Sequence, residues 1–501
     1  ITAGISKLDA SYKTELNAAF TLIGNIFDLK GAITLTEDVL KNTTIIFVDN
    51  TYLPCKDYYG KALVDTSNSY TYTESLDGSY SRTIAFTDYD YTNGTETIND
   101  LSGVVSTSRP DYINPKTNLS YKGYLKNVTG YSETTGGDFF TNSYTVYADN
   151  LYQIIEGKAV VDKSISLTES TNLDGSTSKN LSIMDYSYNT VGVLDGVSNT
   201  GTIDGGLASL RYYSSKFTDA LNDLKQKETT IETESGNVLD IGYSEGADGE
   251  FFTLYAAISF SKDAFDNISI VKVKNTYLGI DKLYGGKVLV DTQTTIIVGS
   301  YNIDGSITTQ TTPSVVDYVY TDGTGGTYKG LLKSATETQS SKTTSEDIFT
   351  NTSTTQTINT YFVSLNYRAL VEKTINLTSS ETIDGADTFT VSGVKYNYDP
   401  ANDRLTGTGG QDLVFSLTDY WGEITNIIGA DSPLLTELGL VSTSNITGTI
   451  SVSEDHFTNT SLSLIENTYT LTENGQAKVS TSTTFTLSDN IDGSMGYSIG
   501  R

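Results

Sequence analysis

The sequence predicts an all-β protein of tandem antiparallel β-sandwich domains, because its composition favours strands and a module recurs five times along it. Thr, Ser and Asn number 77, 54 and 33 of the 501 residues, and Tyr adds 35. This mixture of β-forming and small hydroxyl residues favours strands and turns over helices. With 37% hydrophobic and 11% aromatic residues the chain can bury cores, and its length indicates several domains.

Five copies of the module share one internal spacing. An Asp is followed four residues later by Asn, twelve later by a second Asn and fourteen later by Tyr. Identical spacing in five places indicates a repeated structural unit. The first Asp and two Asn of the copies are Asp38/Asn42/Asn50, Asp138/Asn142/Asn150, Asp263/Asn267/Asn275, Asp347/Asn351/Asn359 and Asp455/Asn459/Asn467.

Each copy continues with a strand and a turn. A Val opens the strand, and an apolar residue followed by Asp-Gly ends it, as at Leu76-Asp77-Gly78. Asp-Gly between alternating runs predicts a hairpin, since both residues tolerate the positive φ of a tight turn. In the first four copies a Tyr-x-Tyr return strand follows. The further Asp-Gly pairs are Asp174-Gly175, Asp304-Gly305, Asp384-Gly385 and Asp492-Gly493.

Copies 1, 3 and 5 are preceded by similar strands at 31–38, 256–263 and 448–455, which copies 2 and 4 lack. The copies therefore group as 1+2 and 3+4, with the fifth unpaired. Apolar residues at helical spacing predict short helices or connectors at 6–29, 207–234 and 412–440, clearest at Phe217, Leu221 and Leu224. The predicted order is an N-terminal segment that is either a connector or a donor strand (1–30), β domain 1 (31–206), a connector (207–255), β domain 2 (256–408), a connector (409–447) and an incomplete β module (448–501).

The charge balance limits the classes of partner. Asp and Glu number 61 against 32 Lys and Arg, a net charge of −29. Nucleic acid needs clustered basic side chains, so it is excluded as a partner. No run approaches the about 20 apolar residues that cross a bilayer, so we expect no membrane span. A single Cys, Cys55, leaves no internal disulfide, and we expect its thiol to be packed.

The sequence offers few residues that could carry out enzymatic catalysis. The only His is His456, for which we expect a strand position beside the core rather than a catalytic or metal-binding role. We therefore expect no enzymatic activity and no cofactor. Ca²⁺ is the only ion for which the sequence offers candidate ligands. They lie in two acidic stretches, although neither has the residue spacing of a known calcium-binding loop. Their residues are Asp88, Asp90 and Asn93 in one, and Asp240, Glu245, Asp248 and Glu250 in the other.

N-glycosylation is the most specific chemistry that the sequence indicates. Ten Asn-x-Ser/Thr sequons occur, close to the number that so many Ser and Thr residues give by chance. Their positions carry more weight, because four of them fall on the first Asn of a module. The candidates are Asn42, Asn93, Asn118, Asn127, Asn180, Asn267, Asn351, Asn376, Asn445 and Asn459.

In composition the whole chain resembles secreted crenarchaeal surface glycoproteins, which are rich in Thr, Ser, Asn and Tyr and nearly free of Cys. The resemblance implies an archaeal protein of the cell surface or extracellular space, either a filament (thread) or an S-layer subunit. Filaments of this kind join by donor-strand complementation, in which a strand of one subunit completes the sheet of the next. The continuous apolar helix of a type IV pilin is lacking at residues 1–30.

The leading hypothesis is a structural subunit of an extracellular glycoprotein filament, pilus-like and assembled head to tail from identical copies. The fifth module lacks a Tyr-x-Tyr strand, so we expect a neighbour to complete it by β-augmentation. Residues 1–7 or 31–38 of the next subunit are the candidate donors. The alternatives are an S-layer lattice held by cations and a surface adhesin.

Overall fold

The computed structural model describes residues 32–37, 43–75, 78–97, 113–114, 116–138, 141–278, 288–323, 328–399, 403–472 and 476–501. It is 59% strand and 11% helix, which confirms the prediction of a mostly β protein with large antiparallel sheets and few short helices. The chain divides into two compact units. Unit 1 is Ile1–Asp223 with Tyr243–Ala257, and unit 2 is Leu224–Gly242 with Ile258–Arg501.

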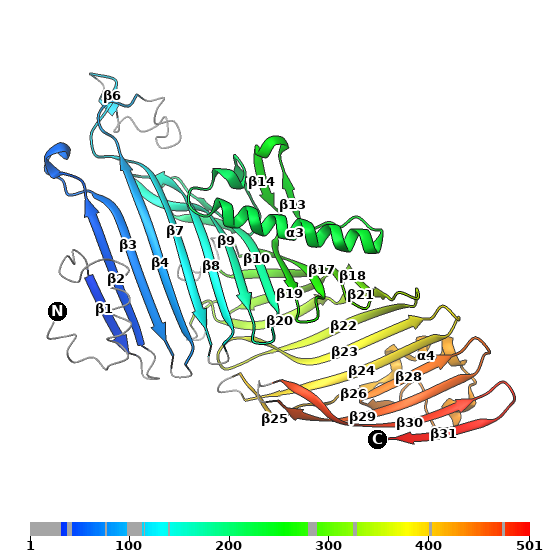
Figure 1. The fold of residues 1–501 in the computed structure, drawn as a ribbon. Helices are drawn as coiled ribbons and strands as arrows, with labels where there is room; N and C mark the ends of the chain where they lie inside the picture. Colours follow the sequence, from blue (N-terminus) through cyan, green and yellow to red (C-terminus); the bar gives the residue numbers. More distant parts are fainter. Residues whose placement is uncertain are drawn as a thin grey trace. The chain divides into compact units, whose positions relative to one another are not determined.

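The main sheet of unit 1 is an antiparallel meander in which each strand pairs with the next one along the chain (Figure 1). Alternating side chains bury Ile45 and Phe47 on one strand and Leu181 and Ile183 on another. The strands are β1 (Ala32–Glu37), β2 (Thr43–Tyr52), β3 (Val64–Glu74), β4 (Tyr80–Tyr91), β7 (Leu125–Gly137), β8 (Ser143–Ile155), β9 (Lys158–Thr171), β10 (Thr177–Tyr188) and β11 (Leu194–Ser198).

Unit 1 also contains a short helix and two small sheets. A 3-10 helix, η2 (Cys55–Tyr58), follows β2, and β5 (Ile113–Asn114) pairs with β6 (Leu119–Ser120). A separate three-stranded sheet joins β12, β14 and β13. Their bounds are Gly201–Asp204, Phe251–Leu254 and Tyr243–Glu245 respectively.

The strands of unit 2 also pair antiparallel. Pro313 separates β18 from β19, because Pro has no N–H for a sheet ladder. Both of these strands pair with β17 on one side and with β21 and β20 on the other. The strands up to this point are β15 (Ala257–Lys262), β16 (Ile268–Tyr277), β17 (Val290–Tyr301), β18 (Ile307–Thr312), β19 (Ser314–Tyr320), β20 (Leu332–Gln339) and β21 (Ser341–Glu346).

The second half of unit 2 pairs in chain order from β21 to β24, and then from β28 to β31. Strands β25 and β28 both pair with β24, at different parts of its length. The bounds are β22 (Thr352–Val363), β23 (Ala369–Glu381), β24 (Asp387–Tyr398), β25 (Leu405–Asp412), β28 (Thr449–Glu454), β29 (Thr460–Leu471), β30 (Ala477–Asp489) and β31 (Met495–Gly500).

Helices occur in two of the three stretches where the sequence indicates them. Helix α3 (Ser214–Ser235) buries Phe217, Leu221 and Leu224, the stripe identified in the sequence. Between β25 and β28 lie β26 (Val414–Ser416), α4 (Trp421–Ile428), α5 (Pro433–Glu437) and β27 (Asn445–Thr447), and their apolar side chains share a core with the strands around them. The helical stretch expected at 6–29 lies outside the described residues.

The structure corrects the expectation that copies 2 and 4 have no strand before the module. Copies 2 and 4 lack the sequence of the lead-in strand, but β7 and β21 occupy that place before Asp138 and Asp347. The copies thus differ less than their sequences indicate. Sandwich packing and the boundaries of the six segments remain predictions, since the pairings found within each unit are those of open meanders.

No helix among the described residues is long and apolar enough to cross a membrane.

Candidate functional site

The recurring Asp and first Asn of the module form a hydrogen-bonded pair that we call the Asp–Asn clasp. In each clasp the Asn backbone N–H donates to Asp Oδ1 over 2.9–3.0 Å, and its side-chain Nδ2 donates to Oδ2 over 2.7–2.8 Å. The residue before the Asn has positive φ, at Thr141, Asp266, Thr350 and Thr458. The four clasps in the described residues are Asp138–Asn142, Asp263–Asn267, Asp347–Asn351 and Asp455–Asn459.

The same Asn side chain reaches a second turn. Its Oδ1 accepts the backbone N–H of the apolar residue before Asp-Gly over 2.8–2.9 Å, as Asn351 does from Ile383. Within that turn the Gly has positive φ, between 78° and 85° in all five copies. This confirms the predicted role of Asp-Gly in the hairpins. One Asn thereby ties together two turns that lie more than 30 residues apart in the chain.

Hydrogen bonds favour the ionised carboxylate in several of these turns. The hydrogen bond from the Asn side chain, supported by two backbone N–H groups, lowers the pKa of Asp347 and of Asp455. The Asp-Gly residue Asp492 has a lowered pKa because the side chain and backbone of Ser494 donate to it. These three turns therefore carry negative charge.

The structure separates the glycosylation candidates into two groups. At Asn267, Asn351 and Asn459 the side-chain nitrogen donates within a clasp. Asn42 lies outside the described residues. The exposed candidates are Asn93, Asn118, Asn127 and Asn445, while Asn180 and Asn376 are half-buried on β10 and β23.

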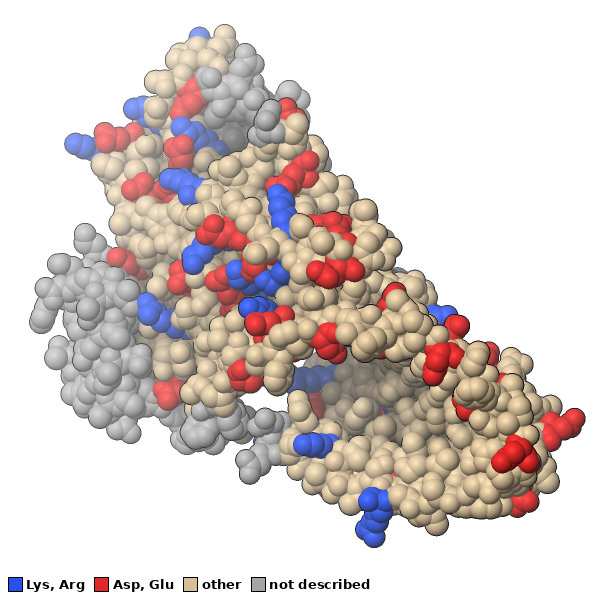
Figure 2. Space-filling model, turned by 45° about the vertical axis from the view of Figure 1, so that its right-hand side comes forward, with Lys and Arg blue, Asp and Glu red and all other residues tan. Residues whose placement is uncertain are grey.

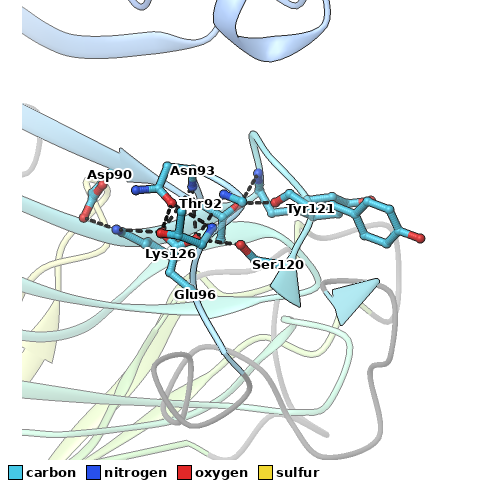
Figure 3. Close-up of polar contacts among 10 residues, drawn as sticks. Asp90, Thr92, Asn93, Glu96, Ser120, Tyr121 and Lys126 are labelled. Carbon is cyan, nitrogen blue, oxygen red and sulfur yellow. Dashed lines mark hydrogen bonds and ion pairs between the residues drawn. The ribbon is translucent and has the colours of Figure 1, made fainter. Parts of the chain in front are cut away.

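Glu96 organises the loop that carries the exposed candidate Asn93 (Figure 3). Its carboxylate accepts the N–H groups of Asn93 and Gly94, the Ser120 hydroxyl at 2.6 Å and Lys126 Nζ at 3.2 Å. Lys126 also pairs with Asp90. Burial would raise the pKa of Glu96, but the hydrogen bonds from Ser120, Asn93 and Lys126 outweigh it and lower the pKa to about 2. This carboxylate is a structural anion, already fully hydrogen-bonded.

Residues 121–126 (YKGYLK) and 328–333 (YKGLLK) are similar in sequence, and this similarity has a structural cause. Thr92 is fully buried, and its hydroxyl donates to the Tyr121 carbonyl and accepts the Tyr124 N–H. Thr321 makes the same two bonds, with Tyr328 and Leu331. The loop fold therefore recurs in both units.

Asp149 is a buried carboxylate that sequence reasoning missed. Only 1% of it is exposed, and it accepts the backbone N–H groups of Tyr212 and Tyr213, the two residues before α3. Burial raises its pKa, against these bonds and the charge of Arg211. Asp149 directly precedes Asn150, the second Asn of its module, and this position in the repeat is the only sequence signal that points to it. Asp149 positions the start of the helix on the sheet.

Three of the calcium candidates are paired with basic side chains. Asp88 lies 3.0 Å from Arg211, Asp90 is 3.2 Å from Lys126 and Asp240 is 2.7 Å from Lys272. Figure 2 shows Lys and Arg interspersed among Asp and Glu on the face in view. In the part of the chain that is described, no three His, Cys, Asp or Glu side chains converge as a metal site would require.

Two residues lie where we did not expect them. His456 occupies an exposed turn between β28 and β29, not a strand beside the core, because it belongs to the clasp turn. Cys55 is exposed rather than packed, because it opens the 3-10 helix η2 directly after Pro54.

Replacing Asn351 with Ala should destabilise the fold by about 1–3 kcal/mol, because both side-chain hydrogen bonds are lost, the one to Asp347 within the clasp and the one from Ile383 in the neighbouring turn. Asn445→Ala is the matched control, since it also removes a sequon but lies exposed on β27. It should change stability by less than about 0.5 kcal/mol. Thermal unfolding measures both, and equal effects would contradict the role of the clasp.

Glu96→Gln should lower stability only above acidic pH. The pKa of Glu96 is about 2 in the folded state against an ordinary 4.5, so its charged form stabilises the fold above pH 4.5. That stability is lost as the pH falls from 4.5 towards 2. The melting temperatures of wild type and variant should therefore differ at pH 6 and converge near pH 2. A difference that stays constant over this range would show that the charge is irrelevant.

Comparison with known protein families gives no matching family model for this chain. No match to a curated protein is found either. The function therefore has to be argued from the residues and their geometry alone.

Proposed function

We propose that this protein is a structural subunit of an extracellular glycoprotein filament, formed by end-to-end association of identical copies. The observation that supports the proposal most is an exposed strand edge among the described residues of unit 2. Strand β30 pairs along its whole length with β29, but with β31 only over residues 484–489. In the described part of the chain no strand covers residues 477–483 on the side away from β29.

The hydrogen-bonding direction of this edge follows from the register. Asn490 N–H donates to the Ser494 carbonyl, so these two residues form a hydrogen-bonded pair. Such pairs alternate along antiparallel strands, so the even-numbered residues of β30 face β31 with their main-chain groups. Thr484 is the last of them opposite β31, and Ser482 is the next. Ser482 therefore presents its N–H and C=O at the open edge, as a template for another strand.

Exposed apolar side chains accompany this edge. Val479 on β30 is 46% exposed, and Tyr497 and Ile499 on β31 are 62% and 77% exposed. Main-chain pairing supplies affinity in β-augmentation, and apolar side chains beside the edge add buried area. A strand from another copy would gain both.

A contact between two different surfaces of identical copies gives an open fibre unless its rotation closes a ring. Of the two candidate donors, strand β1 is already paired with β2 of its own chain. Residues 1–7 lie outside the described residues and are the donor that we favour. Composition supports an extracellular location and N-linked glycans, since Thr, Ser and Asn dominate and one Cys is present.

Ser482→Pro should abolish end-to-end association, because Pro removes the outward N–H and places its ring on the docking edge. The fold should tolerate the change, since that N–H has no partner strand. Ser482→Ala keeps the N–H and is the control. Sedimentation velocity should show polymers for wild type and Ser482→Ala, and none for Ser482→Pro. Polymers of wild-type size in the Pro variant would exclude this edge as the contact.

Deleting residues 1–10 tests the donor separately. If residues 1–7 complete β30 of a neighbour, the shortened protein should remain folded and unassembled in the same sedimentation assay. A synthetic peptide of residues 1–10 should then bind the shortened protein, and should bind its Ser482→Pro form at least tenfold more weakly. Polymers of normal length from the shortened protein would rule out this donor.

A further inference from the structure

One end of the unit 2 sheet exposes apolar side chains at regular intervals. Each clasp turn presents a Phe, and each Asp-Gly turn presents an Ile. Their exposed fractions are 62–74%, far more than large apolar side chains normally show. We name this set the apolar ridge, and it consists of Phe265, Ile303, Phe349, Ile383, Phe457 and Ile491.

The turns of the ridge lie directly side by side. The space that a Cβ at Gly305 would need is occupied by Ile348 of the next clasp turn. Likewise a Cβ at Gly385 would lie 3.4 Å from His456 Nδ1 in the clasp turn after it. Clasp turns and Asp-Gly turns therefore alternate along one continuous edge, so the exposed side chains form a row rather than scattered single residues.

Hydrogen bonds fix the backbone under each ridge side chain. The N–H groups of Phe265, Phe349 and Phe457 each donate to the Oδ1 of their clasp Asp over 2.8 Å. The N–H groups of the three Ile residues donate to the clasp Asn side chains. The ridge is therefore held in position before any partner binds, which lowers the entropic cost of binding.

Folding does not account for apolar residues at these positions. The third residue of the clasp turn is Leu or Phe in every copy, and the residue before Asp-Gly is Leu or Ile. Exposed turns normally carry polar residues, and these side chains bury little of their surface within unit 2. A contiguous exposed apolar surface of this kind marks an interaction site.

We propose that the apolar ridge is a lateral docking surface for the ridge of a second copy of this chain. A row with a constant repeat matches an antiparallel copy of itself at every turn. When that copy is aligned over the whole row without offset, each Asp-Gly turn faces a clasp turn, and like Asp-Gly carboxylates stay apart. A lipid surface is disfavoured, because it would cover Asp304, Asp384 and Asp492 on all sides and remove them from water, whereas contact with a second narrow row leaves both flanks open to solvent.

The size of the ridge suits a protein interface. Six side chains at roughly 100–150 Å² each expose about 600–900 Å², close to the about 800 Å² that each partner buries in a standard complex. This surface differs from the open edge of β30. The ridge would join subunits side by side, whereas the β30 edge would join them end to end.

The test replaces Phe265, Phe349 and Phe457 with Ser together, in the full chain carrying Ser482→Pro to prevent end-to-end association. The parent Ser482→Pro protein should form dimers, and the triple variant should dimerise at least tenfold more weakly by sedimentation equilibrium. Its melting temperature should not fall, since the three side chains are exposed. A control with Leu365, Tyr367 and Tyr328 replaced by Ser removes three other exposed side chains of unit 2 and should dimerise like the parent.

Three results would overturn the proposal. The first is a Ser482→Pro protein that stays monomeric at high concentration, and the second is a triple variant that dimerises as tightly as the parent. The third is a parent protein that floats with phosphatidylcholine vesicles and loses this property in the triple variant, which would assign the ridge to lipid. Failure of end-to-end assembly in wild type would leave the dimer measurement intact, so the two proposals fail separately.

Discussion

The hydrogen bonds of one Asn side chain determine much of this architecture. In each described clasp the Asn donates to an Asp four residues earlier and accepts from a turn more than 30 residues later. Long antiparallel strands rich in Thr and Ser are weakly specified in register, because their two faces differ little in polarity. The clasp specifies the register instead, because it fixes two neighbouring turns and thereby the strands that leave them.

The two proposed interfaces depend on this constraint in different ways. The ridge consists of side chains whose backbone the clasps and turns hold in place. The open edge depends on the register that the turn at Asn490 and Ser494 sets for β30 and β31. An edge with defined hydrogen-bonding direction selects a partner strand, whereas an edge that slips would favour nonspecific aggregation. Rigid turns therefore serve both stability and ordered assembly in this account.

Local chemistry was predictable from the sequence, and long-range chemistry was not. The four-residue spacing of Asp347 and Asn351 marked the repeated unit, because a hydrogen bond over so short a separation leaves a fixed spacing in the sequence. The bond from Ile383 to Asn351 depends on strand pairing and left no pattern to find. His456 was misplaced for a related reason, since apolar residues at its position in other copies imitate a buried strand. The exposed candidate Asn93 could be named as a sequon, but only the Glu96 hydrogen bonds show how its loop is held.

Association of identical copies through defined edges into an open fibre can be seen by electron microscopy of the purified wild-type protein over a concentration series. We expect fibres with a single axial repeat, which thicken by side-by-side association as concentration rises. Isolated particles at every concentration, or flat two-dimensional lattices that disperse in chelator, would contradict it.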